Sequence, residues 1–197
     1  MIEGSPLAVA LLAGGRSRRF GSDKALYVPP GFTEPMWRLQ LDKLLALGAE
    51  EVLVSVGAAS LASPRFMPPP EVRMIADRVA DRGPLGGLVA LLSEIQSPQL
   101  LVLGVDMPGV KVASLRRFVA ACPEGRGLVP QLDGRWEPLL AIYPRALVEL
   151  AEERLAAGEL SLQGLIDAGV AHGWMDAWPV SAEEAEWFVN LNRPTAP

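Results

Sequence analysis

Residues 6–26 read PLAVALLAGGRSRRFGSDKAL, an apolar run that changes abruptly into a loop rich in glycine and arginine. The run at 6–12 is short and almost wholly apolar, which is typical of a buried β-strand. Glycine lets the backbone turn tightly and approach a ligand closely, and consecutive free amide groups can surround phosphate oxygens. This stretch therefore predicts a strand that leads into an anion-binding loop.

The loop also carries a concentration of positive charge. Arg16, Arg18, Arg19 and Lys24 lie within nine residues. Arginine can bind phosphate through two parallel hydrogen bonds, and lysine acts as a mobile point charge. The glycine spacing is neither GxGxxG nor that of a Walker A loop, so a different phosphate-binding loop is indicated. On composition alone, a solvated basic loop with glycine turns remains an alternative.

Strand patterns alternate with helical patterns beyond this loop. We expect further strands at 51–57, 72–76 and 99–105, and helices at 35–48, 85–96 and 112–121. Parallel neighbours need crossover connections, so this order predicts an α/β fold with helices on both faces of a parallel sheet. After about residue 125 the elements become shorter. There we expect strands at 127–131, 136–143, 172–178 and 186–191, with helices at 145–157 and 161–168.

Composition excludes several functional classes. The 197 residues are 50% hydrophobic and 21% charged, and no apolar run approaches the roughly 20 residues of a membrane-spanning helix. The first residues, MIEGSP, lack the positive charge of a secretory signal, and Cys122 is the single cysteine, so we expect a cytoplasmic protein. A formal net charge of -5 argues against a broad nucleic-acid-binding face.

The order of residues in the glycine-rich loop resembles LAGGxSxRxGxDK, the signature of the molybdenum cofactor guanylyltransferase (MobA) family within the MobA-like nucleotidyltransferases. The matching positions are Leu12, Ala13, Gly14, Gly15, Ser17, Arg19, Gly21, Asp23 and Lys24. Phe20 stands where the family usually has Met. Sugar and isoprenoid nucleotidyltransferases share LAGGxGxR but usually lack the Ser and the DK pair. The resemblance covers most of the chain.

The resemblance implies a three-layer α/β/α Rossmann-like nucleotidyltransferase fold with a mostly parallel central sheet. We expect one domain over 1–197, with 1–125 as the nucleotide-binding part and 126–197 as an acceptor-side extension. The expected nucleotide-binding residues are Leu12, Ala13, Gly14, Gly15, Lys24, Asp77 and Asp106. The expected catalytic residues are Arg19, Lys24 and Asp106.

Asp106 is also the expected metal ligand. It follows the apolar run at 99–105, so its carboxylate should project from the carboxyl edge of the sheet, where Mg²⁺ takes one or two carboxylates together with substrate phosphates. The resemblance assigns the same role to the aspartate of DMP. It also implies a nucleotide contact for Asp77 and a place near the base or ribose for the GPLGG turn at 83–87. A surface charge run is the alternative for Asp77.

Three places depart from the family pattern or leave a role open. Family members often carry an Asn after the second strand, where VLVSVGAAS offers Ser55 and Gly57. Asn190 and Asn192 resemble the NxN of the family ending, with Arg193 in place of Thr, and this pair either contacts ligand or braces a loop. WEPLLAIYP at 136–144 resembles a stretch on the acceptor side.

The implied activity is transfer of GMP from GTP to molybdopterin, which forms the guanine dinucleotide cofactor and pyrophosphate. Transient contacts with cofactor assembly proteins or molybdoenzymes are also implied. Three alternatives stay open: a cytidylyltransferase on the same acceptor, another sugar- or alcohol-phosphate nucleotidyltransferase, and a nucleotide-binding adaptor without turnover. We expect no chemistry from His172, the only histidine, or from Cys122.

Overall fold

The computed structural model describes residues 6–13, 24–56, 66–76, 82–181 and 183–188. In this part of the chain eight strands form one sheet, in the order β3-β2-β1-β4-β7-β5-β6 with β8 beside β5. Pairs β1–β2, β2–β3, β1–β4 and β5–β8 are parallel, whereas β7 runs antiparallel to both β4 and β5, and β6 to β5. The strands are β1 (Leu7–Leu12), β2 (Val52–Val56), β3 (Arg73–Ala76), β4 (Gln99–Gly104), β5 (Gly127–Leu132), β6 (Arg135–Trp136), β7 (Leu140–Pro144) and β8 (Met175–Pro179).

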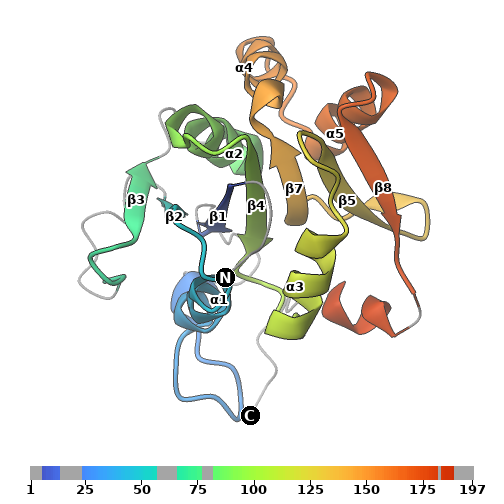
Figure 1. Cartoon of the computed structure of the whole chain (residues 1–197). Coiled ribbons are helices and arrows are strands. Elements are labelled where there is room, and N and C mark those ends of the chain that lie inside the picture. Colours follow the sequence, from blue (N-terminus) through green and yellow to red (C-terminus); the bar gives the residue numbers. More distant parts are fainter. Residues whose placement is uncertain (1–5, 14–23, 57–65, 77–81, 182, 189–197) are drawn as a thin grey trace.

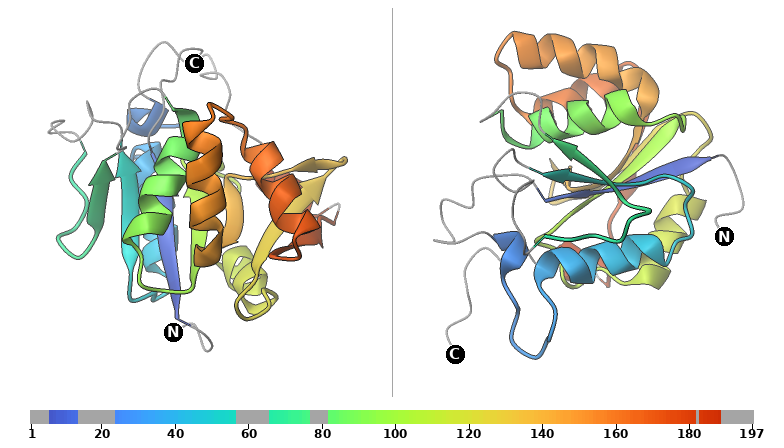
Figure 2. Two further views of the ribbon diagram at one scale, coloured as in Figure 1. Left: turned by 90° about the horizontal axis from the view of Figure 1, so that it is seen from above. Right: turned by 90° about the vertical axis from the view of Figure 1, so that its left-hand side faces the viewer.

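Helices cover both faces of the sheet. Helices α1 (Met36–Leu45) and α3 (Val112–Ala120) lie on one face. Helices α2 (Gly83–Glu94), α4 (Val148–Ala156) and α5 (Leu162–Ala171) lie on the other, and the side view in Figure 2 shows the three layers. The expected α/β/α class is therefore confirmed, with a sheet that mixes parallel and antiparallel pairs (Figure 1).

The central strands are apolar throughout because both of their faces are covered. In β1, Val9 and Leu11 pack into the core beneath α1 and α3, whereas Ala8 and Ala10 pack into the core beneath α2, α4 and α5. All four are fully buried. Alternate residues of a strand point to opposite faces, so a strand between two helical layers needs apolar residues at every position.

Two of the expected strands are wrong. The expected strand at 136–143 is two strands, β6 and β7, separated by a turn in which Leu140 N donates to Glu137 O at 3.1 Å. The described part of 186–191 is helical: η3 (Glu184–Phe188) is a 3-10 helix. Ser181 and Glu184 form a reciprocal capping box before it, in which Ser181 N donates to the Glu184 carboxylate and Glu184 N to Ser181 Oγ.

The GPLGG segment at 83–87 is also not a turn. Helix α2 begins at Gly83, and Pro84 occupies its first turn, where the missing N–H of proline costs nothing. Gly86 and Gly87 are buried in the second turn. The helix expected at 85–96 is therefore confirmed but begins two residues earlier, and the GPLGG segment forms its amino-terminal part.

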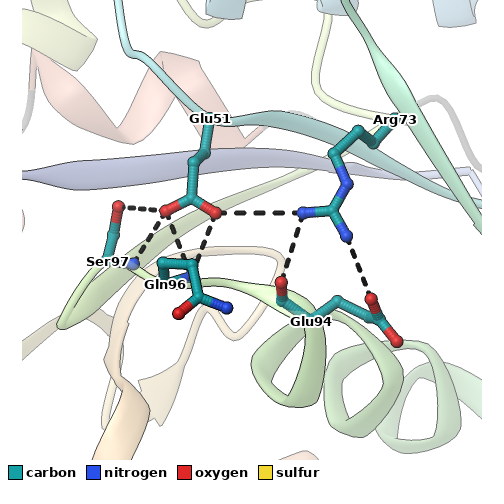
Figure 3. Close-up of polar contacts among 5 residues, drawn as sticks. All are labelled: Glu51, Arg73, Glu94, Gln96 and Ser97. Atoms are coloured by element: carbon teal, nitrogen blue, oxygen red, sulfur yellow. Dashed lines mark hydrogen bonds and ion pairs between the residues drawn. The ribbon is translucent and has the colours of Figure 1, made fainter.

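Glu51 joins three segments at the amino edge of the sheet, as Figure 3 shows. Its carboxylate accepts hydrogen bonds from Gln96 N at 3.0 Å and from Ser97 N at 2.7 Å, and a further one from Ser97 Oγ. Arg73 Nη1 lies 3.9 Å from Glu51 Oε2, and Arg73 Nη2 forms an ion pair with Glu94 Oε2 at 2.9 Å. Glu51 therefore connects the start of β2 to the loop that precedes β4.

We expect Glu51→Gln to lower the free energy of unfolding by about 1–3 kcal/mol at neutral pH, because a charged acceptor with several donors is lost. Burial by itself raises the pKa of Glu51, but the hydrogen bonds from Ser97 and Gln96, with Arg73 nearby, bring the pKa below its ordinary value of 4.5. The stabilisation is therefore complete above the unfolded pKa and is lost as pH falls through the folded pKa.

Urea unfolding of wild type and Glu51→Gln between pH 3 and pH 7 checks this. The difference in unfolding free energy between the two proteins should shrink as pH falls below the ordinary glutamate pKa of 4.5 and through the lower pKa of folded Glu51. The exposed neighbour Glu50 provides the control: Glu50→Gln should have nearly the same unfolding free energy as wild type at every pH. A difference that stayed constant down to pH 3 would contradict the role of the Glu51 charge.

Among the described residues, no helix has both the length and the hydrophobicity to cross a membrane.

Candidate active site

The carboxyl ends of four parallel strands form one edge of the sheet. Leu12, the last residue of β1, lies beside Ser55 of β2 and Gly104 of β4. Ala13 N then donates to Ser55 O at 3.0 Å, which keeps the chain on β2 as it leaves the sheet. Leu12 is buried and Ala13 half-buried, so these two expected nucleotide-binding residues lie at the edge where ligands bind in such sheets.

Lys24 and Asp106 meet at this edge, although 82 residues separate them in sequence. Lys24 begins the short helix η1 (Lys24–Leu26), which is anchored by the buried Ala25, and Asp106 follows the end of β4. Lys24 Nζ lies 3.2 Å from Asp106 Oδ2, and the two side chains are 13% and 17% exposed. Two of the expected site residues thus form a largely buried ion pair.

The second oxygen of Asp106 has no hydrogen-bond partner among the described residues. Oδ1 is buried, and most buried carboxylate oxygens accept a hydrogen bond. Gly104 makes room for this oxygen: a Cβ at residue 104 would lie 2.9 Å from it. An unpartnered carboxylate oxygen at the ligand-binding edge fits a divalent cation, because hard cations take oxygen ligands. Asp106 is therefore the residue that could hold a metal.

Helix α1 supports the turn that follows Asp106. Lys43 Nζ donates to Pro108 O at 2.9 Å, and Met107 is fully buried against the same core. Burial lowers the pKa of Lys43 to about 8. Lys43 thereby fixes the main chain two residues beyond Asp106.

A second acid, Glu137, lies near Asp106 on the turn between β6 and β7. Glu137 is half-buried. Burial raises its pKa, the negative charge of Asp106 raises the pKa further, and Arg135 opposes both. Among the described residues, Glu137 is therefore a second acid close to Asp106, with Arg135 as a nearby opposite charge.

The helix η3 packs on the other side of the Asp106 turn. Gly109 lies so close to this helix that a Cβ on residue 109 would be 2.7 Å from Glu186 O. Glu184 fixes this helix, because its carboxylate accepts hydrogen bonds from Arg117 at 2.9 Å and from Trp178 at 3.4 Å. Burial raises the pKa of Glu184, but the hydrogen bonds from Ser181 and Trp178, together with Arg117, bring it below the ordinary value. The end of the described chain is thereby held beside the site.

The structure brings together Leu12, Ala13, Lys24 and Asp106 of the expected site residues. Gly14, Gly15, Arg19, Asp77 and the Asn190 and Asn192 pair lie outside the described residues. Sequence reasoning missed Lys43 and Glu137. One sequence signal could have drawn attention to Lys43: the chain has only three lysines against fifteen arginines, so each lysine is unusual.

His172 and Cys122 have the surroundings of packing residues. Burial, with the charge of Asp176, raises the pKa of the Cys122 thiol to about 11 although Gln99 donates a hydrogen bond to it, so the reactive thiolate is disfavoured. The His172 ring stacks on Trp174 with a centroid distance of 4.9 Å, and its Nδ1 lies 2.7 Å from the Ala168 carbonyl oxygen. Both residues lie away from the Lys24–Asp106 pair in the fold.

A hollow of about 680 Å³ opens at the opposite edge of the sheet. It is bounded by the end of α2, the residues before β4 and the start of α4, with Ser93, Pro98 and Arg145 in its wall. Because Pro98 precedes β4 whereas Asp106 follows it, this hollow is separate from the site at the carboxyl edge.

Comparison with known proteins agrees with this geometry. Residues 9–172 match the MobA-like NTP transferase domain. The "probable molybdenum cofactor guanylyltransferase" of Opitutus terrae is 36% identical over 96% of this chain and 92% of its own length. The protein of the same name from Chloroflexus aggregans is 34% identical over 93% and 88%.

A solved structure has the same fold. Molybdopterin-guanine dinucleotide biosynthesis protein A from Archaeoglobus fulgidus superposes with a TM-score of 0.69 at 25% identity, covering 95% of this chain and 93% of that one. The sequence match extends from β1 to the end of α5, and so includes both Lys24 and Asp106. This chain therefore belongs to the MobA-like NTP transferase family.

Proposed function

We propose that this protein transfers GMP from GTP to a molybdopterin-type molybdenum cofactor and releases pyrophosphate. The observation that carries the proposal is the ion pair of Lys24 with Asp106 at the carboxyl edge of the sheet, where the buried Oδ1 of Asp106 has no partner among the described residues. A cation beside an acid with free coordinating capacity suits a phosphate chain bound together with a divalent metal. Relatives named molybdenum cofactor guanylyltransferase support the choice of nucleotide and acceptor.

The reaction exchanges one phosphoanhydride bond for another. An oxygen of the acceptor phosphate forms a bond to the α-phosphorus of GTP, while the bond from that phosphorus to the bridging oxygen of pyrophosphate breaks. The attacking oxygen is already ionised, so no side chain has to act as general base. Catalysis then consists of aligning two anions and neutralising the charge that develops between them.

The residues at the edge of the sheet divide this work. Lys24 neutralises phosphate charge, Asp106 would hold the cation through Oδ1, and Lys43 fixes the turn behind it. Bound Mg²⁺ would supply electrostatic stabilisation of the phosphate oxygens. We assign Leu12, Ala13, Gly14 and Gly15 to backbone contacts with the nucleotide, Arg19 to the phosphates and Asp77 to the nucleoside, on the family signature at residues 12–24 and the family resemblance around residue 77.

The choice of base is tested by calorimetry of GTP, CTP, ATP and UTP with Mg²⁺ on the full chain. We expect GTP to bind at least about tenfold more tightly than the others, because a site that hydrogen-bonds one base leaves polar groups unpaired with another. Asp106→Ala measured alongside should weaken binding of the Mg²⁺ complex. Preference for CTP would make the protein a cytidylyltransferase, and absence of binding to all four would favour a non-catalytic adaptor.

The product is a reactive cofactor, so direct transfer to a protein of cofactor assembly or to a molybdoenzyme in the cytoplasm belongs to the same proposal. Pull-down of molybdoenzyme apoproteins with the product-loaded protein tests this step separately.

A further inference from the structure

The turn that carries Glu137 lies directly against the end of β4. Strands β4 and β7 pair antiparallel, with Leu103 opposite Leu140. One residue further along, Gly104 N donates to Leu139 O at 2.6 Å. The residues just before β7 therefore lie beside the residues that lead from β4 to Asp106.

Asp106 and this turn occupy the same small space. A Cβ at Gly104 would lie 2.9 Å from Asp106 Oδ1 and 3.0 Å from the Cβ of Leu139. The unpartnered oxygen of Asp106 thus packs next to the turn, two residues from Glu137. In keeping with this arrangement, burial raises the pKa of the Glu137 carboxyl and the negative charge of Asp106 raises it further.

Main-chain hydrogen bonds hold this turn, and they do not involve the Glu137 side chain. Glu137 N donates to Pro130 O at 2.9 Å, and Glu137 O accepts from Leu140 N at 3.1 Å. The preceding residue, Trp136, is attached to α5 through Gln163 and through its indole N–H, which donates to Asp167 at 2.7 Å. Within the described part of the chain, the Glu137 carboxylate itself takes part in no hydrogen bond or ion pair. The main chain at Glu137 is thus held in place, and no described residue takes up its carboxylate oxygens.

We propose that Glu137 is a second carboxylate that binds the divalent cation held by Asp106. Two acids close to each other repel, and a cation bound by both would relieve that repulsion. Among the described residues Lys24 pairs with Oδ2 of Asp106 and the charge of Arg135 acts on Glu137, while Oδ1 of Asp106 accepts no hydrogen bond. Mg²⁺ commonly takes one or two carboxylates and completes its shell with water and substrate phosphates. This inference rests on the proposed nucleotidyl transfer and adds a residue to it.

Cation affinity is the readout, because it can be measured without turnover. We expect Glu137→Gln to weaken Mn²⁺ binding about tenfold, measured on the protein with GTP bound and no acceptor present. Electron paramagnetic resonance of free Mn²⁺ and calorimetry both give this affinity. Glu137→Asp should lie between Glu137→Gln and wild type. Glu149, exposed on α4, gives a control of equal charge change: Glu149→Gln should bind Mn²⁺ like wild type. Thermal unfolding of each variant verifies the fold.

Unchanged Mn²⁺ affinity in a folded Glu137→Gln variant would overturn the inference, and an accompanying rise in KM for the acceptor would assign Glu137 to acceptor binding instead. If Glu137→Gln does not fold, the same measurement on Glu137→Asp decides. The proposed function fails in a different way: wild type itself would then not prefer GTP. If wild type transfers GMP and Glu137→Gln binds Mn²⁺ like wild type, the inference about Glu137 is wrong while the proposed function stands.

Discussion

Asp106→Asn should lower kcat for guanylyl transfer about a thousandfold while the protein remains folded. The amide keeps the shape of the side chain but removes the negative charge that faces Lys24 and the oxygen that we assign to the cation. Both losses act where phosphate charge has to be neutralised, so the effect should fall mainly on turnover. Single-turnover measurement of pyrophosphate release at saturating Mg²⁺ and GTP gives the rate.

Stability separates this effect from general damage. Asp106 Oδ1 bonds to no described residue, and the ion pair retains some solvent contact, so we expect the unfolding free energy of Asp106→Asn to change by less than about 2 kcal/mol. Asp42, exposed on α1 and paired with Arg38, is the matched control, and Asp42→Asn should keep the wild-type rate. Retention of more than about a tenth of wild-type activity by Asp106→Asn would contradict a metal-binding role.

Lys24→Ala should reduce kcat by about a hundredfold to a thousandfold, the second largest effect that the site predicts. Lys24 Nζ donates to the Asp106 carboxylate, and the flexible lysine side chain allows this ammonium group to follow phosphate oxygens when a nucleotide binds. Removal leaves both Asp106 and the phosphates less neutralised. Steady-state kinetics with varied GTP should show a fall in kcat larger than any rise in KM, because the charge develops in the transition state.

Two variants sharpen the test of Lys24. Lys24→Arg keeps the charge but brings a planar, bulkier group into a largely buried position, so we expect it to restore only part of the rate. Lys111, exposed just before α3, is the control, and Lys111→Ala should turn over like wild type. Wild-type kcat for Lys24→Ala at saturating substrates would remove Lys24 from the catalytic machinery.

The strands of the first half are largely predictable from sequence because of where they lie. β1 and β4 are covered on both faces, so each is a continuous apolar run that ends at a glycine or an acid. The short strands after residue 125 are harder to predict. Pro138 and the turn before Leu140 interrupt an apolar run that resembles one strand. The break is defined by two hydrogen bonds of Glu137, from its N to Pro130 O and to its O from Leu140 N.

The helix at the end of the described chain had a local signal that the apolar pattern concealed. Trp187 and Phe188 are apolar residues suited to a strand, and they are indeed buried. Ser181 and Glu184, three residues apart, form the capping box that starts η3 instead. Local hydrogen bonding thus outweighed strand propensity, because it satisfies main-chain groups at the helix start.

The order of residues in the loop at 12–24 and the acid after β4 were sufficient, by themselves, to indicate the family and the Lys24–Asp106 site, since a strand end and its following residue are local properties. The place of β7 between β4 and β5 was decided only by tertiary structure. That antiparallel insertion brings the turn with Glu137 beside Asp106, and α1 brings Lys43 to Pro108. Contacts between segments far apart in sequence depend on how whole layers pack, and no local pattern records them.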